Sequence, residues 1–378
     1  MQIACRRAKV LFVSLLFVFS FVVIAPAQST IHVPADVPSI QQAIFQANNG
    51  DVVLVSPGTY FEVLNFQGKA ITVQSTDGPA VTIIDAQNSF SAVSFTNGEG
   101  PGSVLRGFTV THGFGSQEGG GIEIVNGSPT IDGNVITANQ ACSGSGISAN
   151  GSSSVISNNT ISNNSTSACT PPQGGAGIRI VGAGNVHLLN NTITGNQITN
   201  GGNGGGVVVD VLAAPLVSGN LIQNNSTVGN GGGIAVNSSA LLVNNVIANN
   251  SAATGGGIYS LLNQAQPSFL NNTVAGNSAN QGTQLFIDGL WRRCGAAPLF
   301  AVARRTLAEQ WRKVASNCKE RLYAQAFCNR VTQRRCGHRL RRKYQSQFWR
   351  NGRAGSHSLH TGQSKPNGQG HTPPDQCV

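Results

Sequence analysis

The residues best suited to chemistry in this chain are few. Between residues 119 and 284 the sequence offers Glu123, Asp132 and Asp210 as acids and Arg179 as the one strong base. A guanidinium and carboxylates on one face can hydrogen-bond sugar hydroxyls, and two carboxylates about 5–10 Å apart can hydrolyse a glycosidic bond. Tyr259 adds an aromatic ring on which a sugar could stack. Whether these side chains meet depends on the elements that carry them.

Those elements form a repeat. Six Gly-led blocks, such as "EGGGIEI" and "GGGIAV", place an aliphatic residue at Ile122, Ile147, Ile178, Val207, Ile234 and Ile258, with spacings of 24 to 31 residues. A second block, apolar-x-x-Asn-x-apolar-x-x-Asn, follows each of these. Its second apolar position holds Ile136, Ile161, Ile193, Ile222, Ile247 and Val274. The apolar runs are too short for helices, and this period is typical of a solenoid. Each strand would pair in parallel with its counterpart one coil away, at roughly 4.8 Å.

The asparagines of the second block predict two polar columns at the corners of the coil. Asn tolerates left-handed dihedral angles, and stacked amides can hydrogen-bond the equivalent amides above and below. The first predicted ladder is Asn134, Asn159, Asn191, Asn220, Asn245 and Asn272. The second is Asn139, Asn164, Asn196, Asn225, Asn250 and Asn277. The glycines before each aliphatic residue predict a tight bend or a positive φ.

These blocks resemble the right-handed parallel β-helix proteins of the pectin-lyase-like fold, over residues 31–287. The opening "IHVPADVPSIQQAIFQANNGDVVLVSPGTYFE" resembles the N-terminal cap of secreted members, and helical spacing over residues 38–48 predicts a helix that closes the open end. We therefore expect an all-β, single-stranded right-handed parallel β-helix with an N-terminal helical cap and an irregular basic C-terminal tail. The expected divisions are residues 1–27, a signal peptide; 28–115, the cap and first coils; 116–289, the repeats; and 290–378, the tail.

Strand alternation predicts one outward-facing surface that could bind carbohydrate. One column takes the residue after each internal aliphatic, and a second takes the residue two positions further on. The candidates on these columns are Glu123, Asn150, Arg179, Asp210, Asn237 and Tyr259. Glu123 and Arg179 would stand two coils apart, roughly 10 Å. The alternative is a scatter of solvated polar side chains.

The scarcity of ionisable residues favours a non-catalytic protein. We found no paired aspartates and no motif of polygalacturonases or pectate lyases in the repeats. The function expected is therefore a secreted or cell-surface protein that binds polysaccharide. The alternative is a polysaccharide-active enzyme, pectate-lyase-like or a glycoside hydrolase, with Glu123, Arg179 and Asp210 as weak catalytic candidates. No metal site or cofactor is predicted, and calcium is possible only if the protein is a lyase.

The start of the chain predicts export. Arg6, Arg7 and Lys9 precede the apolar residues 10–24, and "APA" at residues 25–27 suits signal cleavage, with a membrane anchor as the alternative. No later segment is apolar enough to span a bilayer, so the mature protein should be secreted, periplasmic or on the cell surface. Cys142 and Cys169 follow the second ladder in adjacent coils, where they could form a disulfide in an oxidising compartment.

The end of the chain differs from the body. Residues 290–378 carry 18 Lys and Arg against 3 acids, a balance of +15, whereas residues 28–289 carry 3 against 11, a balance of −8. The acidic body argues against nucleic-acid binding there. The tail could be a basic arm for nucleic acid, lipopolysaccharide or acidic polysaccharide, or a zinc site from Cys328, Cys336 and His338. We prefer a third interpretation, a shifted reading frame, because Arg, Cys and Trp accumulate there without the period.

Overall fold

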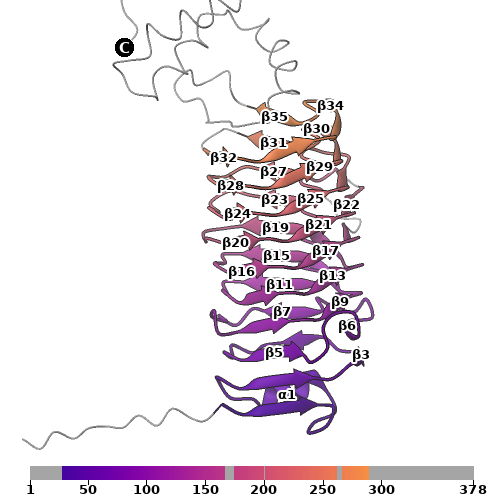
Figure 1. Ribbon diagram of the computed structural model, residues 1–378, viewed down its shortest axis with the longest axis vertical. Coiled ribbons are helices and arrows are strands. Elements are labelled where there is room, and N and C mark those ends of the chain that lie inside the picture. Colours follow the sequence, from indigo (N-terminus) through magenta and orange to yellow (C-terminus); the bar gives the residue numbers. More distant parts are fainter. Residues whose placement is uncertain (1–27, 167–173, 200, 262–265, 289–378) are drawn as a thin grey trace, which may run out of the picture. The chain divides into compact units, whose positions relative to one another are not determined.

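The computed structural model describes residues 28–166, 174–199, 201–261 and 266–288 as 35 strands and one short helix, α1 (Ile40–Gln46). The strands form four parallel sheets, in which each strand pairs with its counterpart in the next coil (Figure 1). The solenoid is all-β and right-handed, as predicted. We call the sheets A to D, and each complete coil visits them in the order C, A, B, D.

Sheets A and B form two walls of the coil. Sheet A contains β1 (Thr30–Val33), β2 (Val52–Val55), β5 (Thr72–Ser75), β8 (Val104–Arg106), β12 (Thr130–Asp132), β16 (Val155–Ser157), β20 (His187–Leu189), β24 (Leu216–Ser218), β28 (Leu241–Val243) and β32 (Ser268–Leu270). Sheet B contains β3 (Gly58–Tyr60), β6 (Thr82–Asp85), β9 (Thr109–Thr111), β13 (Val135–Thr137), β17 (Thr160–Ser162), β21 (Thr192–Thr194), β25 (Leu221–Gln223), β29 (Val246–Ala248) and β33 (Thr273–Ala275).

Sheets C and D complete the coil. Sheet C contains β4 (Leu64–Asn65), β7 (Val93–Phe95), β11 (Ile122–Val125), β15 (Ile147–Asn150), β19 (Ile178–Val181), β23 (Val207–Val209), β27 (Ile234–Val236), β31 (Ile258–Leu261) and β35 (Leu285–Asp288). Sheet D contains β10 (Phe114–Glu118), β14 (Gln140–Ser143), β18 (Ser165–Thr166), β22 (Gln197–Ile198), β26 (Ser226–Thr227), β30 (Ser251–Thr254) and β34 (Ser278–Gln281).

The predicted helix lies against the first strands of the solenoid (Figure 1). Ser39 caps α1, and the Glu62 carboxylate accepts hydrogen bonds from the Ile40 and Gln41 amides at 3.0 and 2.9 Å. At the other end the Lys69 ammonium donates to three main-chain carbonyls. An anion at the N-terminus and a cation at the C-terminus both complement the helix dipole, so side chains from the first coils stabilise this short helix.

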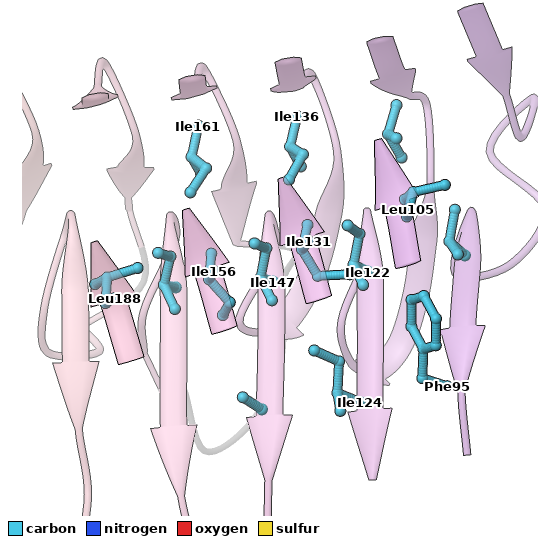
Figure 2. Packing of buried hydrophobic residues seen from close by; sticks show 14 of the residues in the cluster. Phe95, Leu105, Ile122, Ile124, Ile131, Ile136, Ile147, Ile156, Ile161 and Leu188 are labelled. Carbon is cyan, nitrogen blue, oxygen red and sulfur yellow. The ribbon is translucent and has the colours of Figure 1, made fainter. Parts of the chain in front are cut away.

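Aliphatic columns fill the interior of the coil. The two predicted columns, headed by Ile122 on sheet C and Ile136 on sheet B, are buried and paired in register from coil to coil. Sheet A contributes a third column that includes Ile131 and Ile156. Figure 2 shows these side chains converging from the three sheets. Because a single short sheet cannot bury its own apolar face, this shared core holds the walls together.

Both asparagine ladders are present, and every one of the twelve amides is buried. In a typical step, the Asn191 Oδ1 accepts from the Asn159 main-chain N–H and Nδ2 at 2.9 and 3.0 Å. The first ladder lies where sheet A turns into sheet B, the A/B corner, and the second where sheet B turns into sheet D, the B/D corner.

The conformational part of the ladder prediction was wrong. The left-handed dihedral angles belong to the residues just before the ladder asparagines, such as Asn158 (φ 57°) and Asn190 (φ 54°), rather than to the ladder residues themselves. The turn is therefore made by one residue, and the next is left free to hydrogen-bond along the solenoid. Those turn positions hold Asn or Gly, except for Ala138 (φ 55°).

The Gly-led blocks lie where sheet D turns into sheet C, which we call the D/C corner. Their first and last glycines serve different purposes. Gly144 adopts a positive φ of 59°, whereas Gly177 has no such φ but would place a Cβ only 2.4 Å from the Gly206 carbonyl oxygen of the next coil. The first type of glycine turns the chain, and the second allows neighbouring coils to approach.

Candidate functional site

The column of candidate residues on sheet C has the predicted register. Glu123 pairs with Ser148, Ser148 with Arg179, and Arg179 with Val208 on successive strands. The column continues through Ala235 to Tyr259. The strand period therefore placed these side chains on one outer face correctly.

That face is not the open wall that the sequence suggested. Ser148, Val208 and Ala235 are 0%, 4% and 4% exposed, although they point away from the interior core. The left-handed glycine of each D/C corner folds back over the column, so that a Cβ on Gly144 would lie 2.8 Å from the Ser148 Cβ, and one on Gly231 at the same distance from the Ala235 Cβ. Because the corner doubles back, these three side chains are almost completely covered, and only 13% of the Arg179 side chain reaches solvent.

Arg179 forms ion pairs with two carboxylates, one on each side of it along the solenoid. Its Nε donates to the Asp210 Oδ2 at 3.0 Å, and its Nη1 forms a short ion pair with Glu118. Ser148 donates from its Oγ to the other Glu118 oxygen at 3.0 Å. Arg179 is only 13% exposed, so two carboxylates neutralise a largely buried guanidinium. The sequence prediction brought Arg179 and Asp210 together correctly.

Glu118 was missed by the sequence analysis. It ends β10 on sheet D, one residue before residues 119–284, which supplied the predicted acids. The signal was present in the quoted block "EGGGIEI", where Glu118 precedes the turn that carries the chain onto sheet C. A residue just before a reversing turn can reach the column that the turn covers, and this explains how a sheet D residue pairs with a sheet C arginine.

Glu123 lies beside this network without pairing with Arg179. Its Oε2 accepts from the Ser91 hydroxyl at 3.5 Å, a marginal distance for a hydrogen bond. Burial raises the pKa of the Glu123 carboxyl, and the nearby Glu118 charge raises it further. The expected proximity of Glu123 and Arg179 therefore produces no ion pair, and the charge that acts on Glu123 is that of Glu118.

Tyr259 has its own partners. Its ring stacks on Phe286 with centroids 5.8 Å apart and planes 4° from parallel, and its hydroxyl lies 3.1 Å from the Asp288 Oδ2. Burial and the Asp288 carboxylate raise the pKa of this phenol. One face of the ring is thus covered by the next coil, so the tyrosine that was expected to stack on sugar can offer only its other face.

The two remaining candidates lie on the second column. Asn150 ends β15 and Asn237 follows β27, and both are half-buried. Neither amide side chain hydrogen-bonds Arg179 or its carboxylate partners within the described residues. The candidate site therefore centres on Glu118, Glu123, Arg179 and Asp210, which we call the Arg179 cluster, with Ser148 beneath it.

The comparison with known families agrees with the fold. Residues 35–274 match the family model described as "Right handed beta helix region". The chain belongs to the right-handed β-helix family. Among solved structures, this β-helix protein is similar to an alginate lyase from Paenibacillus sp. str. FPU-7, with a TM-score of 0.37 and 16% identity over 69% of this chain and 98% of that one. A search of curated proteins finds no match.

Several predictions for this β-helix protein concern features outside the Arg179 cluster. Cys142 is disulfide-bonded, but its expected partner Cys169 lies outside the described residues. The signal peptide at 1–27 and the basic tail at 290–378 lie outside them too. Within the described part of the chain, no three His, Cys, Asp or Glu side chains gather as they would to hold a metal ion. No helix in that part could span a membrane.

Proposed function

We propose that this protein is exported and binds an extracellular polysaccharide along the D/C corner, without cleaving it. The observation that carries the proposal is the Arg179 cluster, which extends over three strand spacings, from Glu123 on β11 to Asp210 after β23. At roughly 4.8 Å per coil, the cluster extends about 14 Å along the solenoid. An elongated row of fixed carboxylates, with a guanidinium that orients them, suits a chain-like ligand rich in hydroxyl groups.

The arrangement of Arg179 favours binding over lyase chemistry. Its guanidinium donates hydrogen bonds to Glu118 and Asp210, and in this charged form it has no lone pair with which to abstract a proton from a sugar. Its effect is to fix the two carboxylates as hydrogen-bond acceptors. Preorganised acceptors lose little entropy when a ligand binds, which favours affinity.

A second function, glycoside hydrolysis, is favoured by one observation. Glu123 keeps its proton to higher pH than an ordinary glutamate because of burial and the Glu118 charge. A protonated carboxyl next to an ionised one is the acid–base division that glycosidases use. In this alternative, Glu123 would protonate the leaving oxygen, and Glu118 would act as the base or nucleophile.

Binding and turnover measurements on a polysaccharide panel separate the two. The wild-type chain is compared with R179A, E118Q and E123Q by affinity electrophoresis and by release of reducing ends. The matched control is R106A, which breaks the Arg106–Asp132 ion pair (3.0 Å) on sheet A and leaves the D/C corner intact. Binding that R179A weakens and R106A does not, with no product released, supports the proposal.

Turnover that disappears in both E118Q and E123Q would replace the binding function with hydrolysis. Binding that is unchanged in R179A and E118Q would remove the D/C corner as the site, whatever the ligand.

A further inference from the structure

Two exposed aromatic side chains lie on the chain segments next to Glu118 and Glu123. Phe90 is 69% exposed and Phe114 is 38% exposed. The Phe114 amide donates to the Phe90 carbonyl at 2.8 Å, so the two residues lie on adjacent coils. Solvent exposure of two neighbouring phenylalanines costs free energy unless a ligand covers them.

The main chain ties both residues to the cluster. Phe114 begins β10, the strand that ends in Glu118. Phe90 is followed by Ser91, whose hydroxyl lies 3.5 Å from the Glu123 carboxylate. The aromatic pair therefore lies on the N-terminal side of the cluster, where Glu118 and Glu123 lie, with Phe114 at the start of sheet D, just past the B/D corner.

The charge of this region is negative. The cluster holds three carboxylates, of Glu118, Glu123 and Asp210, against the single guanidinium of Arg179. Residues 28–289 as a whole carry 3 Lys and Arg against 11 acids. A polysaccharide with a carboxylate on each sugar would meet like charges here, and like-charge contacts suppress binding of the wrong partner.

We infer that the D/C corner takes a polysaccharide whose sugars carry no negative charge, and that Phe90 and Phe114 form the platform on which its rings stack. This inference rests on the proposed polysaccharide binding and narrows its ligand class. Sugar rings present apolar C–H faces that pack on aromatic rings, and their hydroxyls can donate to the fixed carboxylates of the cluster.

The test uses pairs of polymers that share a backbone and differ in charge: methyl-esterified and de-esterified polygalacturonate, and hydroxyethyl- and carboxymethyl-cellulose. Affinity of the full chain is measured for wild type, F114A, F90A and F61A. Phe61 is the matched control, because it is a similarly exposed phenylalanine in the first coils, near α1. The quantity compared is the difference in affinity between wild type and F114A. Both proteins contain the basic residues 290–378, so any binding of polyanions by those residues cancels in this difference.

We expect F114A and F90A each to weaken binding of an uncharged polymer about five- to tenfold, with F61A unchanged. De-esterified and carboxymethylated polymers should show no dependence on Phe114. A polyuronate whose binding falls in F114A as much as that of its neutral partner would overturn the inference. The inference would also be overturned if R179A weakened binding and F114A did not, although the proposed function would then stand. Failure of every polymer to bind in an R179A-dependent manner would overturn both.

Discussion

The A/B and B/D corners contrast with the D/C corner, although the same coils build all three. At the ladder corners every repeat from Asn134 to Asn277 places the same residue in the same environment. At the D/C corner the corresponding column runs through Glu123, Ser148, Arg179 and Val208, and no two neighbours are alike. Repetition of the backbone is equal in both regions, and only the side chains differ.

This contrast separates the residues that hold the coils together from those that could recognise a ligand. A uniform column gives each coil an identical contact with the next, which is what a stacked solenoid requires. A varied column contributes nothing that depends on periodicity. It places a largely buried charge, Arg179, where the two adjacent coils have small or apolar side chains. Such a departure from the repeat pattern is expected at a functional site.

The largest effect should come from breaking a ladder at its centre. Asn191 accepts from Asn159 and donates to Asn220 and to the Ile156 carbonyl, all of them buried. N191A would leave these groups without partners, and we expect it to lower the free energy of unfolding by about 3–5 kcal/mol. Urea denaturation followed by circular dichroism measures the change.

The same substitution on an exposed asparagine gives the control. The Asn185 side chain is exposed, so N185A should change stability by no more than about 0.5 kcal/mol. Equal effects of the two substitutions would mean that the amide columns do not hold the coils together.

Two glycine substitutions should show a smaller, graded effect. G177A directs a methyl group at the Gly206 carbonyl 2.4 Å away, and the backbone must shift to admit it. We expect a loss of about 3 kcal/mol for G177A. G133A has open space around its Cβ and only the strain of a positive φ, which should cost about 1 kcal/mol. Denaturation midpoints in the reverse order would contradict the distinction between close approach and turning.

The sequence predicted the uniform parts of the molecule well and the varied part incompletely. Both ladders, the Ile122 and Ile136 columns and the cap helix follow from periodicity, because each is repeated or has a strong local signal. The register of Glu123 and Arg179 also follows from strand alternation. The burial of Ser148 and the contact of Glu118 with Arg179 do not follow from alternation. They depend on how far a glycine turn folds back, and alternation does not predict which residues lie above a face.

Two carboxyl groups with opposite pKa shifts extend the comparison to pH. Burial raises the pKa of Glu123 above its ordinary 4.5, with Glu118 adding to the effect. Burial opposes the shift at Asp132, but hydrogen bonds from Asn158 and Ser157, together with Arg106, hold the pKa of that carboxyl below 3.8. Glu123 thus keeps its proton to a higher pH in the folded state than in the unfolded chain, whereas Asp132 gives up its proton at a lower pH.

The two groups therefore contribute to stability with opposite signs. Between pH 4.5 and its raised pKa, Glu123 binds more proton when folded, so stability falls as the pH rises through this window. Asp132 stabilises the fold above pH 3.8, and its contribution is lost as the pH falls through its lowered pKa. Denaturation midpoints across the acidic range should show E123Q gaining on wild type as the pH rises, and D132N approaching wild type as the pH falls. Parallel profiles for the two variants would contradict this assignment.

The smallest expected effect tests whether the ladder corners are as uniform as they look. The residue before each ladder asparagine takes a left-handed conformation, and Ala138 (φ 55°) holds a place that Asn or Gly fills before the other asparagines of the two ladders. Alanine in this conformation is strained, so A138G should raise the free energy of unfolding by about 0.5–1 kcal/mol even though it removes a methyl group. Ala183 is exposed and outside the left-handed region, so A183G should destabilise slightly by increasing the entropy of the unfolded chain. Opposite signs at the two alanines would show that one residue supplies the turn and the next the ladder. A loss of stability in A138G would mean that the turn position carries no strain. It would contradict the assignment of the turn to one residue and of the ladder hydrogen bonds to the next.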